Sequence, residues 1–417
     1  MRIGRLYIAN RADARTVFGL IAVRTIVAGA VPSAARVRVT VGDVCLELPI
    51  ADCLQPLDDG DRWQLTCHVN SHLLANGPQS VTVTLLGPDG AAGDAATLAC
   101  VVDNGSVLAH AVAADLRAFG TPVVFGDVVD SRLFPHGPGK ARAWFEEPVT
   151  GEVPLSLDPA RDRDAAMLHL RRWGFAVLPQ RLPRSLVDDF GRQLDTAIDS
   201  GRLKYERGSS NRIYEAHTLP AGRRIWLYPP VLKFLEALFR DRPCPCQTLT
   251  YAYGSQQQAH QDTIHLTPYP GGYMCGVWVA LQDVQPDSGE LFVCPGSHRL
   301  PRVFGADLGL AKVMGRVDYA AFGTFEQRIR DLVREHGLST VTYRPRAGEI
   351  LVWHENLIHG GSPRLDLARP RLSIVSHYFA RGCVAYYDSR GEAATLVDVG
   401  NETVWGRAKR LVRAAVG

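Results

Sequence analysis

His260, Asp262 and His359 have the side-chain types and the spacing of a metal site. His260 and Asp262 stand two positions apart in residues 260–266, which we expect to form a β-strand, and alternate side chains of a strand point to one face. His359 comes much later, at the mouth of another predicted strand. Two imidazoles and one carboxylate form the ligand set of non-haem Fe(II) oxygenases, which keeps positions open for co-substrate and oxygen. The sequence therefore predicts a catalytic metal centre made of these three residues.

Several short motifs surround these residues in a fixed order. They are GVWVAL at 276–281, DSGEL at 287–291, PGSH at 295–298, AGEILVWH at 347–354, LIHGGSP at 357–363 and RPRLS at 369–373. Together with the HQD at 260–262, this series resembles the phytanoyl-CoA dioxygenase family of Fe(II)/2-oxoglutarate oxygenases over residues 160–385. Agreement of several independent motifs is more specific than any one of them.

An arginine near the metal site is a candidate for binding the co-substrate. Its planar guanidinium matches the two oxygens of a carboxylate. Arg371 opens an apolar, alternating segment shortly after His359, and Arg369 is one alternating step away. The resemblance implies that Arg371 is the arginine that holds the distal carboxylate of 2-oxoglutarate, with Arg369 as the alternative.

The resemblance also implies further co-substrate contacts. Gln261 and Trp278 match positions that touch 2-oxoglutarate in family members, and Thr250 or Gln257 is a candidate for the contact that precedes the HQD motif. The implied cofactors are Fe(II), 2-oxoglutarate and O2. The implied reaction is hydroxylation of an aliphatic C–H, with release of succinate and CO2. The carboxylate of Asp262 disfavours halogenation, because halogenases of this class carry a small residue there.

Other histidines near these motifs have more ordinary interpretations. His298 and His354 are expected to be hydrogen-bonded core residues, because buried polar groups normally find partners. For His265 and His377 we expect a structural or substrate-side role rather than metal ligation. Two other functions also fit the pattern: a cupin-like protein that binds a metal or ligand without turnover, and a metal-dependent isomerase or hydrolase on a similar barrel.

The composition is that of an ordinary globular enzyme. The 417 residues are 46% hydrophobic, and 46 basic against 43 acidic residues give no reason to expect nucleic acid as a partner. Nine cysteines without a disulfide framework indicate reduced thiols and a cytoplasmic location. Residues 17–31 fit a β-strand better than a signal peptide, because Arg24 interrupts them, and no stretch is long enough to span a membrane.

The segment patterns divide the chain into four parts. Residues 1–110 contain short alternating strands with regular turns, which predict a β-sandwich. Residues 111–159 are expected to be a linker with a short helix, and 391–417 a tail with a basic helix at 404–416. Residues 160–390 begin with helices, including one capped by Ser185, and continue with strands, which favours a double-stranded β-helix, a jelly-roll or cupin-like domain. A helical insertion at 307–336 could cover the site. The predicted fold is mostly β with flanking helices.

The residues of the predicted site are compatible with several classes of substrate. A small metabolite, a glycan-linked molecule and a lipid all fit, and the accessory sandwich favours a polar or glycan-linked one. That sandwich could bind a glycan, a carrier protein or a sister subunit in a homo-oligomer, or it could brace the enzyme.

Overall fold

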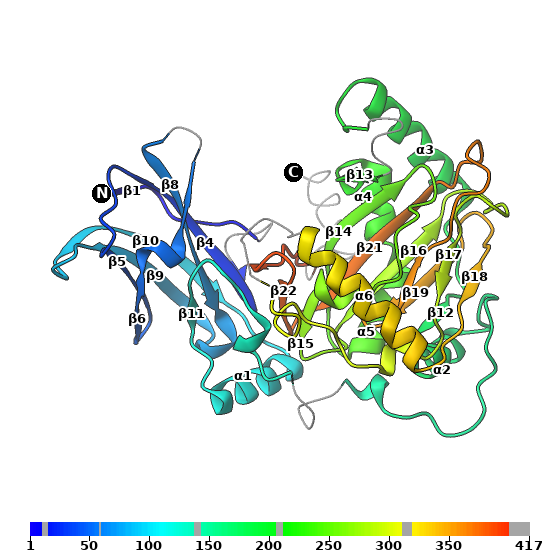
Figure 1. The fold of residues 1–417 in the computed structure, drawn as a ribbon, viewed down its shortest axis with the longest axis horizontal. Helices are drawn as coiled ribbons and strands as arrows, with labels where there is room; N and C mark the ends of the chain where they lie inside the picture. Colours follow the sequence, from blue (N-terminus) through cyan, green and yellow to red (C-terminus); the bar gives the residue numbers. More distant parts are fainter. Residues whose placement is uncertain (11–15, 58–59, 137–142, 206–211, 311–318, 400–417) are drawn as a thin grey trace, which may run out of the picture.

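The computed structural model describes residues 1–10, 16–57, 60–136, 143–205, 212–310 and 319–399. Two β-rich domains lie side by side, the N-terminal one in blue and cyan and the larger one mainly in green, yellow and orange (Figure 1). The predicted mostly-β fold with flanking helices and an N-terminal β-sandwich is confirmed. The predicted basic helix at 404–416 lies outside the described residues. Every described helix is too short or too polar to cross a membrane.

The N-terminal domain consists of two β-sheets that pack face to face. In β5 (Arg36–Val41), Val37, Val39 and Val41 are buried between the sheets while the intervening side chains point outward, as the alternating pattern predicts. The strands of the first sheet are β1 (Arg2–Ile3), β4 (Leu20–Ala28), β8 (Arg62–Asn70) and β11 (Val124–Phe125), with β2 (Tyr7–Ile8) on β4 and β7 (Leu54–Pro56) on β8. The strands of the second are β3 (Thr16–Val17), β10 (Ala92–Val102), β9 (Gly77–Leu86), β5 and β6 (Val44–Pro49).

The larger domain is built on a six-stranded sheet. Its strand order is β12 (Phe175–Val177), β19 (Ile350–His354), β16 (Met274–Ala280), β21 (Ser373–Ala380), β14 (Pro243–Tyr251) and β13 (Arg212–Tyr214). Two small sheets complete the domain: β18 (Val341–Tyr343), β17 (Leu291–Val293) and β20 (His359–Gly361); and β15 (Thr267–Tyr269), β22 (Val384–Tyr387) and β23 (Glu392–Ala393). Trp278 of β16 packs with Leu291 and Val293 of β17, so a small sheet faces the large one, as in a jelly-roll-like domain.

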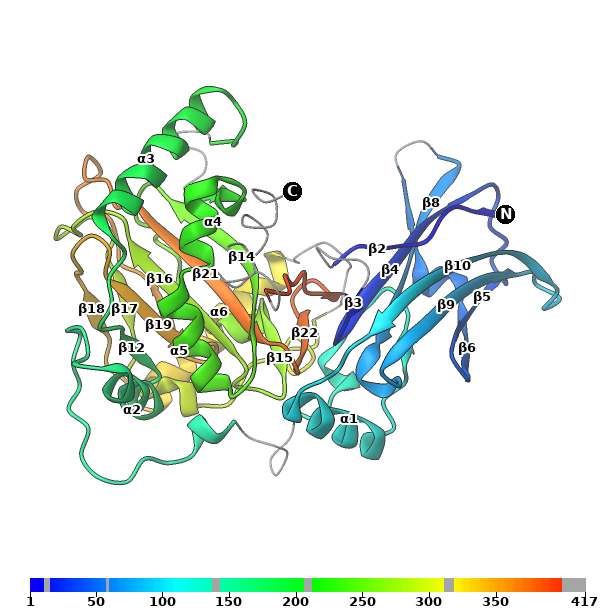
Figure 2. The same cartoon turned by 180° about the vertical axis from the view of Figure 1, so that it is seen from behind.

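Helices cover the other face of the six-stranded sheet (Figure 2). Val277 and Val279 of β16 point to that face, where they join a core with Leu170, Phe190 and Leu235 of the helices. The helices are α2 (Arg163–Trp173), α3 (Arg184–Asp199), α4 (Pro220–Trp226) and α5 (Pro229–Phe239).

The prediction that Ser185 caps α3 is wrong. The helix begins at Arg184, the N-cap residue is Pro183, and no side chain makes a capping hydrogen bond. A proline is tolerated at this helix start because the N–H that it lacks would have no partner within the helix.

Helix α6 (Tyr319–Glu335) lies on the opposite side of the domain, across the front in Figure 1. It is the described helical part of the insertion predicted at 307–336, whereas residues 307–309, also predicted as helical, form a turn. Phe325, Ile329 and Leu332 form its buried face, packed against Ile264 and Ile358 beside the predicted metal ligands. The helix is therefore fixed to the domain by an apolar stripe.

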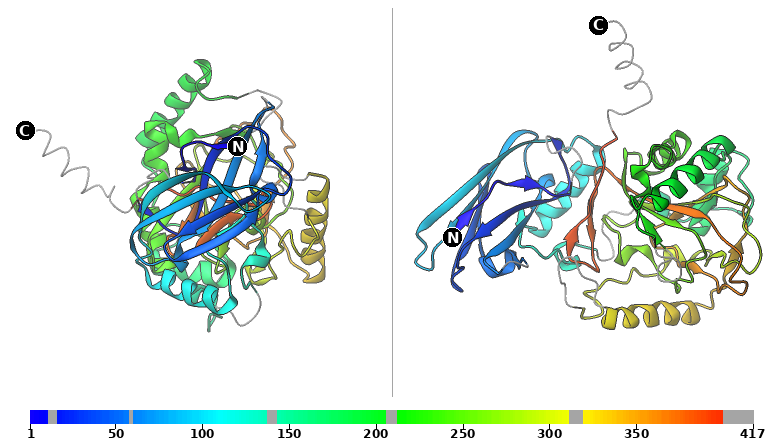
Figure 3. Two further views of the ribbon diagram at one scale, coloured as in Figure 1. Left: turned by 90° about the vertical axis from the view of Figure 1, so that its left-hand side faces the viewer. Right: turned by 90° about the horizontal axis from the view of Figure 1, so that it is seen from above.

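The two domains share a hydrophobic core, which moves two of the predicted boundaries. Leu20 of β4 and Leu116 of α1 (Val107–Phe119) pack with Tyr269, Val384 and Tyr386 of the larger domain. Strand β11 still pairs with β8, so the predicted end of the sandwich at residue 110 is too early. The β22–β23 hairpin runs through the predicted boundary at 390 and lies between the domains (Figure 3).

Candidate metal centre and active-site cavity

Two buried histidines and a buried aspartate converge in one place. One ligand atom each from His260, Asp262 and His359 lies within 4.8 Å of the others. Oδ1 of Asp262 is 3.6 Å from Nε2 of His260 and 3.8 Å from Nε2 of His359. The backbones of the two histidines form a β-bridge with reciprocal N–H···O bonds of 3.0 Å. The residues that the sequence predicts as ligands are thus brought together.

The prediction that His260 and Asp262 share one face of a β-strand is wrong. Residues 260–266 are not a strand: His260 makes only the isolated bridge, and a 3-10 turn begins at Asp262 (Asp262–Ile264). The aspartate reaches the centre because the chain turns there, and the two side chains do not share a face through strand alternation.

Backbone carbonyls fix the orientation of both imidazoles. Nδ1 of His260 donates to the carbonyl of Gln258 at 2.8 Å, and Nδ1 of His359 donates to that of Leu357 at 2.9 Å. Each Nε2 therefore keeps its lone pair directed at the centre, as a metal ligand requires. Burial, with a contribution from His359, lowers the pKa of His260 to about 3, so this imidazole is neutral at physiological pH.

Asp262 is held as an oriented carboxylate. Its Oδ2 accepts a 2.8 Å hydrogen bond from the indole nitrogen of Trp353 and lies 3.5 Å from Nε2 of His377, while Oδ1 faces the two histidine ligands. Burial alone would raise the pKa of Asp262, but the surrounding imidazoles of His359, His377 and His260 lower it well below the usual value. Two imidazoles and one carboxylate on one side of a cavity are a ligand set that fits Fe(II).

Arg371 provides a second buried charge in the same cavity. It is only 2% exposed, and its guanidinium lies 5.5 Å from the ring centre of Trp278. Its amino groups donate to the carbonyl of Gly289 at 2.9 Å and to Oγ of Ser373 at 3.4 Å, but Nε has no partner. Burial lowers the pKa of Arg371 to about 10, so the side chain is still charged at neutral pH.

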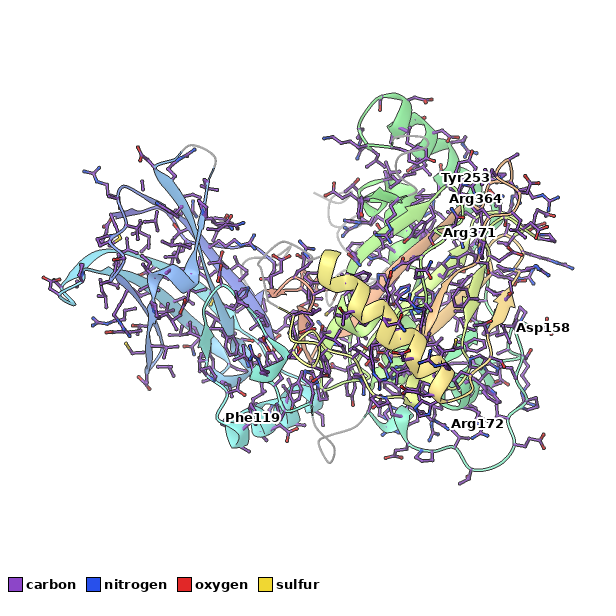
Figure 4. All side chains as sticks on the ribbon, viewed as in Figure 1. Phe119, Asp158, Arg172, Tyr253, Arg364 and Arg371 are labelled. Atoms are coloured by element: carbon purple, nitrogen blue, oxygen red, sulfur yellow. The ribbon has the colours of Figure 1, made fainter. Side chains whose placement is uncertain are left out.

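No acidic side chain among the described residues forms an ion pair with Arg371. A buried cation that lacks a counter-charge is destabilising unless a ligand supplies one. Figure 4 places Arg371 among the strands of the larger domain. The guanidinium fits the distal carboxylate of 2-oxoglutarate, as the sequence predicts. Arg369 does not fit this role, because its side chain is 42% exposed and pairs with Asp366 at 2.8 Å.

Two of the predicted co-substrate residues do not reach the cavity. Thr250 lies on the face of β14 opposite to Leu249 and Tyr251, which line the cavity. Gln261 is fully buried, and its amide bonds to the carbonyl of Pro301 and the N–H of Val303, both at 3.2 Å. The predictions for Thr250 and Gln261 as cofactor contacts are wrong, because both side chains point into the protein. Trp278 lines the cavity, and its contact with 2-oxoglutarate stays a prediction.

The cavity has a volume of about 930 Å³ and extends well beyond the metal ligands. Gln257 lines it, with Nε2 3.1 Å from Nε2 of His260, and was a candidate from the sequence. His265 and His377 also line it. Further lining residues were not predicted as site residues: Tyr251, Trp353, Tyr387, Ser389 and Arg390. Trp353 belongs to the AGEILVWH motif at 347–354, so strand alternation could have identified it. Tyr387, Ser389 and Arg390 lie beyond the region of resemblance, which ends at residue 385.

A buried ion cluster lies behind the cavity. Arg302 pairs with Glu146 and with Glu355 at 2.8 Å, and His354 lies 3.2 Å from Glu146 and 2.8 Å from Glu355. Burial lowers the pKa of His354, but the two carboxylates outweigh this and raise it to about 9. His354 is therefore a partnered core residue, as predicted, and so is the buried His298.

Comparison with known proteins agrees with this geometry. The family model "Phytanoyl-CoA dioxygenase (PhyH)" matches residues 170–365, which contain all three predicted metal ligands. This region is a PhyH domain. The predicted family is thus confirmed, and with it the cofactors Fe(II), 2-oxoglutarate and O2, for which His260, Asp262 and His359 are the candidate metal ligands of this PhyH domain.

Individual relatives are distant. Phytanoyl-CoA dioxygenase domain-containing protein 1 of Danio rerio is 33% identical over 84 residues, which are 19% of this chain and 28% of the relative, so only a minor part of that protein is matched. Among solved structures, the carbocyclase SnoK from nogalamycin biosynthesis is similar with 17% identity, a TM-score of 0.43 and coverage of 54% of this chain and 88% of SnoK. Iron-bound EctD from S. alaskensis has 21% identity, a TM-score of 0.40 and coverage of 59% and 90%.

Proposed function

We propose that the protein is a non-haem Fe(II)/2-oxoglutarate-dependent dioxygenase that hydroxylates an aliphatic C–H of a small metabolite, a glycan-linked molecule or a lipid. Succinate and CO2 are the co-products. The observation that carries the proposal is the buried His260, Asp262 and His359 set in the same cavity as the buried Arg371, which lacks an acidic partner among the described residues. When bound, iron and 2-oxoglutarate supply the oxidising chemistry with O2.

The side chains of this chain bind and orient these groups. His260 and His359 present their Nε2 atoms because backbone carbonyls hold the Nδ1 protons. Trp353 fixes one oxygen of Asp262 so that the other faces the two imidazoles. Arg371 binds the distal carboxylate of the co-substrate and limits its rotation, with Trp278 beside it. These residues pre-organise the site, and the surrounding core excludes water.

Arg371 argues against one of the two alternative functions, and turnover distinguishes the other. A non-oxidative isomerase or hydrolase on this barrel would need the metal but no buried guanidinium beside it. A cupin-like binding protein without turnover would retain 2-oxoglutarate without consuming it. None of the nine cysteines, all of which lie in the described part of the chain, forms a disulfide, and this supports the proposal of a reducing compartment, the cytoplasm.

A substrate screen with oxygen-isotope analysis tests this proposal. The enzyme is incubated with Fe(II), ascorbate, 2-oxoglutarate and 18O2 against panels of polar metabolites, glycosides and acyl compounds. We expect succinate release above the substrate-free level for one panel, and a product that carries one 18O atom. The Asp262→Ala variant, which lacks a ligand, provides the background. Succinate at that background with every panel, or a product without added oxygen, contradicts the proposal.

A further inference from the structure

A thiol and a phenol lie in contact beside the active-site cavity. Sγ of Cys246 is 3.3 Å from the phenolic oxygen of Tyr387, and the two residues are only 6% and 7% exposed. Cys246 belongs to β14 of the six-stranded sheet, whereas Tyr387 belongs to β22 of a small sheet. The contact therefore joins two sheets of the larger domain, through residues that are 141 positions apart in the sequence.

The backbone positions of both residues are well defined. The pairing of β14 with β21 skips Cys246, which is thus the extra residue of a β-bulge, and bulges redirect side chains. Tyr387 is the last residue of β22, and its carbonyl accepts a 2.8 Å hydrogen bond from the N–H of Gly391. The N–H of Val397 donates to the carbonyl of Pro245 at 2.8 Å, so the chain that follows the β22–β23 hairpin is bonded to the bulge itself.

The tyrosine is the member of this pair that faces the cavity. Tyr387, Ser389 and Arg390 form one part of the cavity wall, in the same cavity as the three metal ligands. Cys246 is not one of the described residues that line this cavity. Oxidation of a thiol depends on its exposure, so oxidants in the solvent reach Cys246 poorly. An oxidising metal centre in the cavity, in contrast, reaches the thiol through the phenol.

We propose that Cys246 and Tyr387 become joined by a thioether during turnover at the iron centre, which makes this pair a site of self-modification. The new bond connects Sγ to the ring carbon next to the one that bears the hydroxyl. A sulfur on that carbon lies close to the phenolic oxygen, as Sγ of Cys246 already does. The inference rests on the proposed function, because that reaction supplies the oxidant.

The reaction balances without any further reagent. The S–H bond of Cys246 and one ring C–H bond of Tyr387 break, one C–S bond forms, and two protons and two electrons leave. O2 and 2-oxoglutarate accept them and yield succinate, CO2 and water. The product ties β14 to β22, so it fixes a part of the cavity wall to the six-stranded sheet.

Mass spectrometry detects this link without a known substrate. The protein is produced in iron-limited medium, loaded anaerobically with Fe(II) and 2-oxoglutarate, and then exposed to O2, beside samples that lack one of the three. Dithiothreitol then reduces any disulfide, which a thioether survives. We expect the intact chain to lose the mass of two hydrogen atoms in the complete sample alone. The tryptic peptide 382–390 should be joined to the peptide that carries Cys246, with the link at Tyr387.

Variants locate the link. Cys246→Ser and Tyr387→Phe should each abolish the loss of mass, because the first lacks the sulfur and the second lacks the hydroxyl that activates the ring. Tyr386→Phe is the matched control for the tyrosine, since this adjacent buried phenol lies 3.0 Å from Nε2 of His136. Cys294→Ser is the matched control for the thiol, since Cys294 is buried in the core beneath α6. Both controls should still form the link.

Each outcome has a defined meaning. If neither the purified nor the oxidised parent protein carries the link, or if Cys246→Ser or Tyr387→Phe still loses the mass, the inference is overturned. A link that forms equally without O2, or in Asp262→Ala, which lacks a metal ligand, also overturns it. A link that is already present in the purified parent and absent from Asp262→Ala supports it.

A separate measurement distinguishes this inference from the proposed function. The visible absorption band of the iron–2-oxoglutarate chelate is recorded before O2 is added. A parent protein that shows the band but never the link overturns the self-modification alone. A protein that shows neither the band nor the link contradicts the proposed function as well.

Discussion

Replacing Arg371 by glutamine should separate ligand binding from folding. The guanidinium is 2% exposed and has no acidic partner among the described residues, so a bound carboxylate is the counter-charge that it lacks. Removing one member of a buried charged pair is destabilising by about 3 kcal/mol or more. The dissociation constant of 2-oxoglutarate should therefore rise at least about a hundredfold. Arg371→Lys keeps the charge but loses the planar fork, and we expect an intermediate loss.

The stability of the cofactor-free protein should respond very differently. The Arg371→Gln variant no longer buries an uncompensated charge, and this gain offsets the weaker hydrogen bonds to Gly289 and Ser373. The free energy of unfolding should change by less than about 2 kcal/mol. If Arg371 served only to support the packing of the core, the reverse is expected: Arg371→Gln would lose much stability and bind 2-oxoglutarate almost as tightly as the parent protein.

Anaerobic isothermal titration calorimetry with Fe(II)-loaded protein measures the affinity, and urea unfolding measures the stability. Arg369→Gln is the matched control, since this arginine is two residues away but partly exposed and paired with Asp366. It should bind 2-oxoglutarate like the parent protein. An affinity of Arg371→Gln within threefold of the parent, or a comparable loss in Arg369→Gln, would refute the assignment.

Three further predictions concern the groups around the metal ligands. Trp353→Phe removes the indole N–H that orients Asp262 and should weaken Fe(II) binding about 10- to 100-fold in anaerobic metal titrations, with unchanged affinity as the contrary result. A Cβ at Gly276 would lie 2.3 Å from the Trp353 ring, so Gly276→Ala should lower the free energy of unfolding by about 1–3 kcal/mol and also weaken Fe(II) binding. Gly191→Ala in α3 is the control and should lower neither, because a Cβ there would meet no atom within 4 Å outside its own helix backbone. The pKa of His354 is raised to about 9, so the stability that its ion cluster contributes should be complete below about pH 6.5 and lost as the pH rises through 9. Urea unfolding at pH 6 and 9.5 should show this loss in the parent protein and not in His354→Gln.

The sequence was sufficient for the parts of the site that depend on motif order. The ligands His260, Asp262 and His359 follow from residue types and family resemblance, and the choice of Arg371 over Arg369 agrees with the burial of Arg371. The strands of the sandwich follow from their alternation, because each sheet buries one face.

Other features depend on register and tertiary contacts. The prediction for Thr250 missed the cavity-lining positions Leu249 and Tyr251 by one residue, and a shift of one position moves a strand side chain to the opposite face. Gln261 points inward because the chain turns after His260, which short motifs do not reveal. The wall at Ser389 and Arg390 could not be predicted, since it depends on the packing of β22 and β23 against a domain far away in the sequence.

The most direct test of the central claim is an anaerobic titration of the purified protein with Fe(II) and 2-oxoglutarate, followed by visible absorption. The account predicts a weak charge-transfer band of the iron–2-oxoglutarate chelate with one metal per chain, absent in His359→Ala and weakened in Arg371→Gln. Absence of the band from folded, metal-loaded protein would contradict the assignment of this cavity as the active site. So would a band in both variants that is as strong as the band of the parent protein.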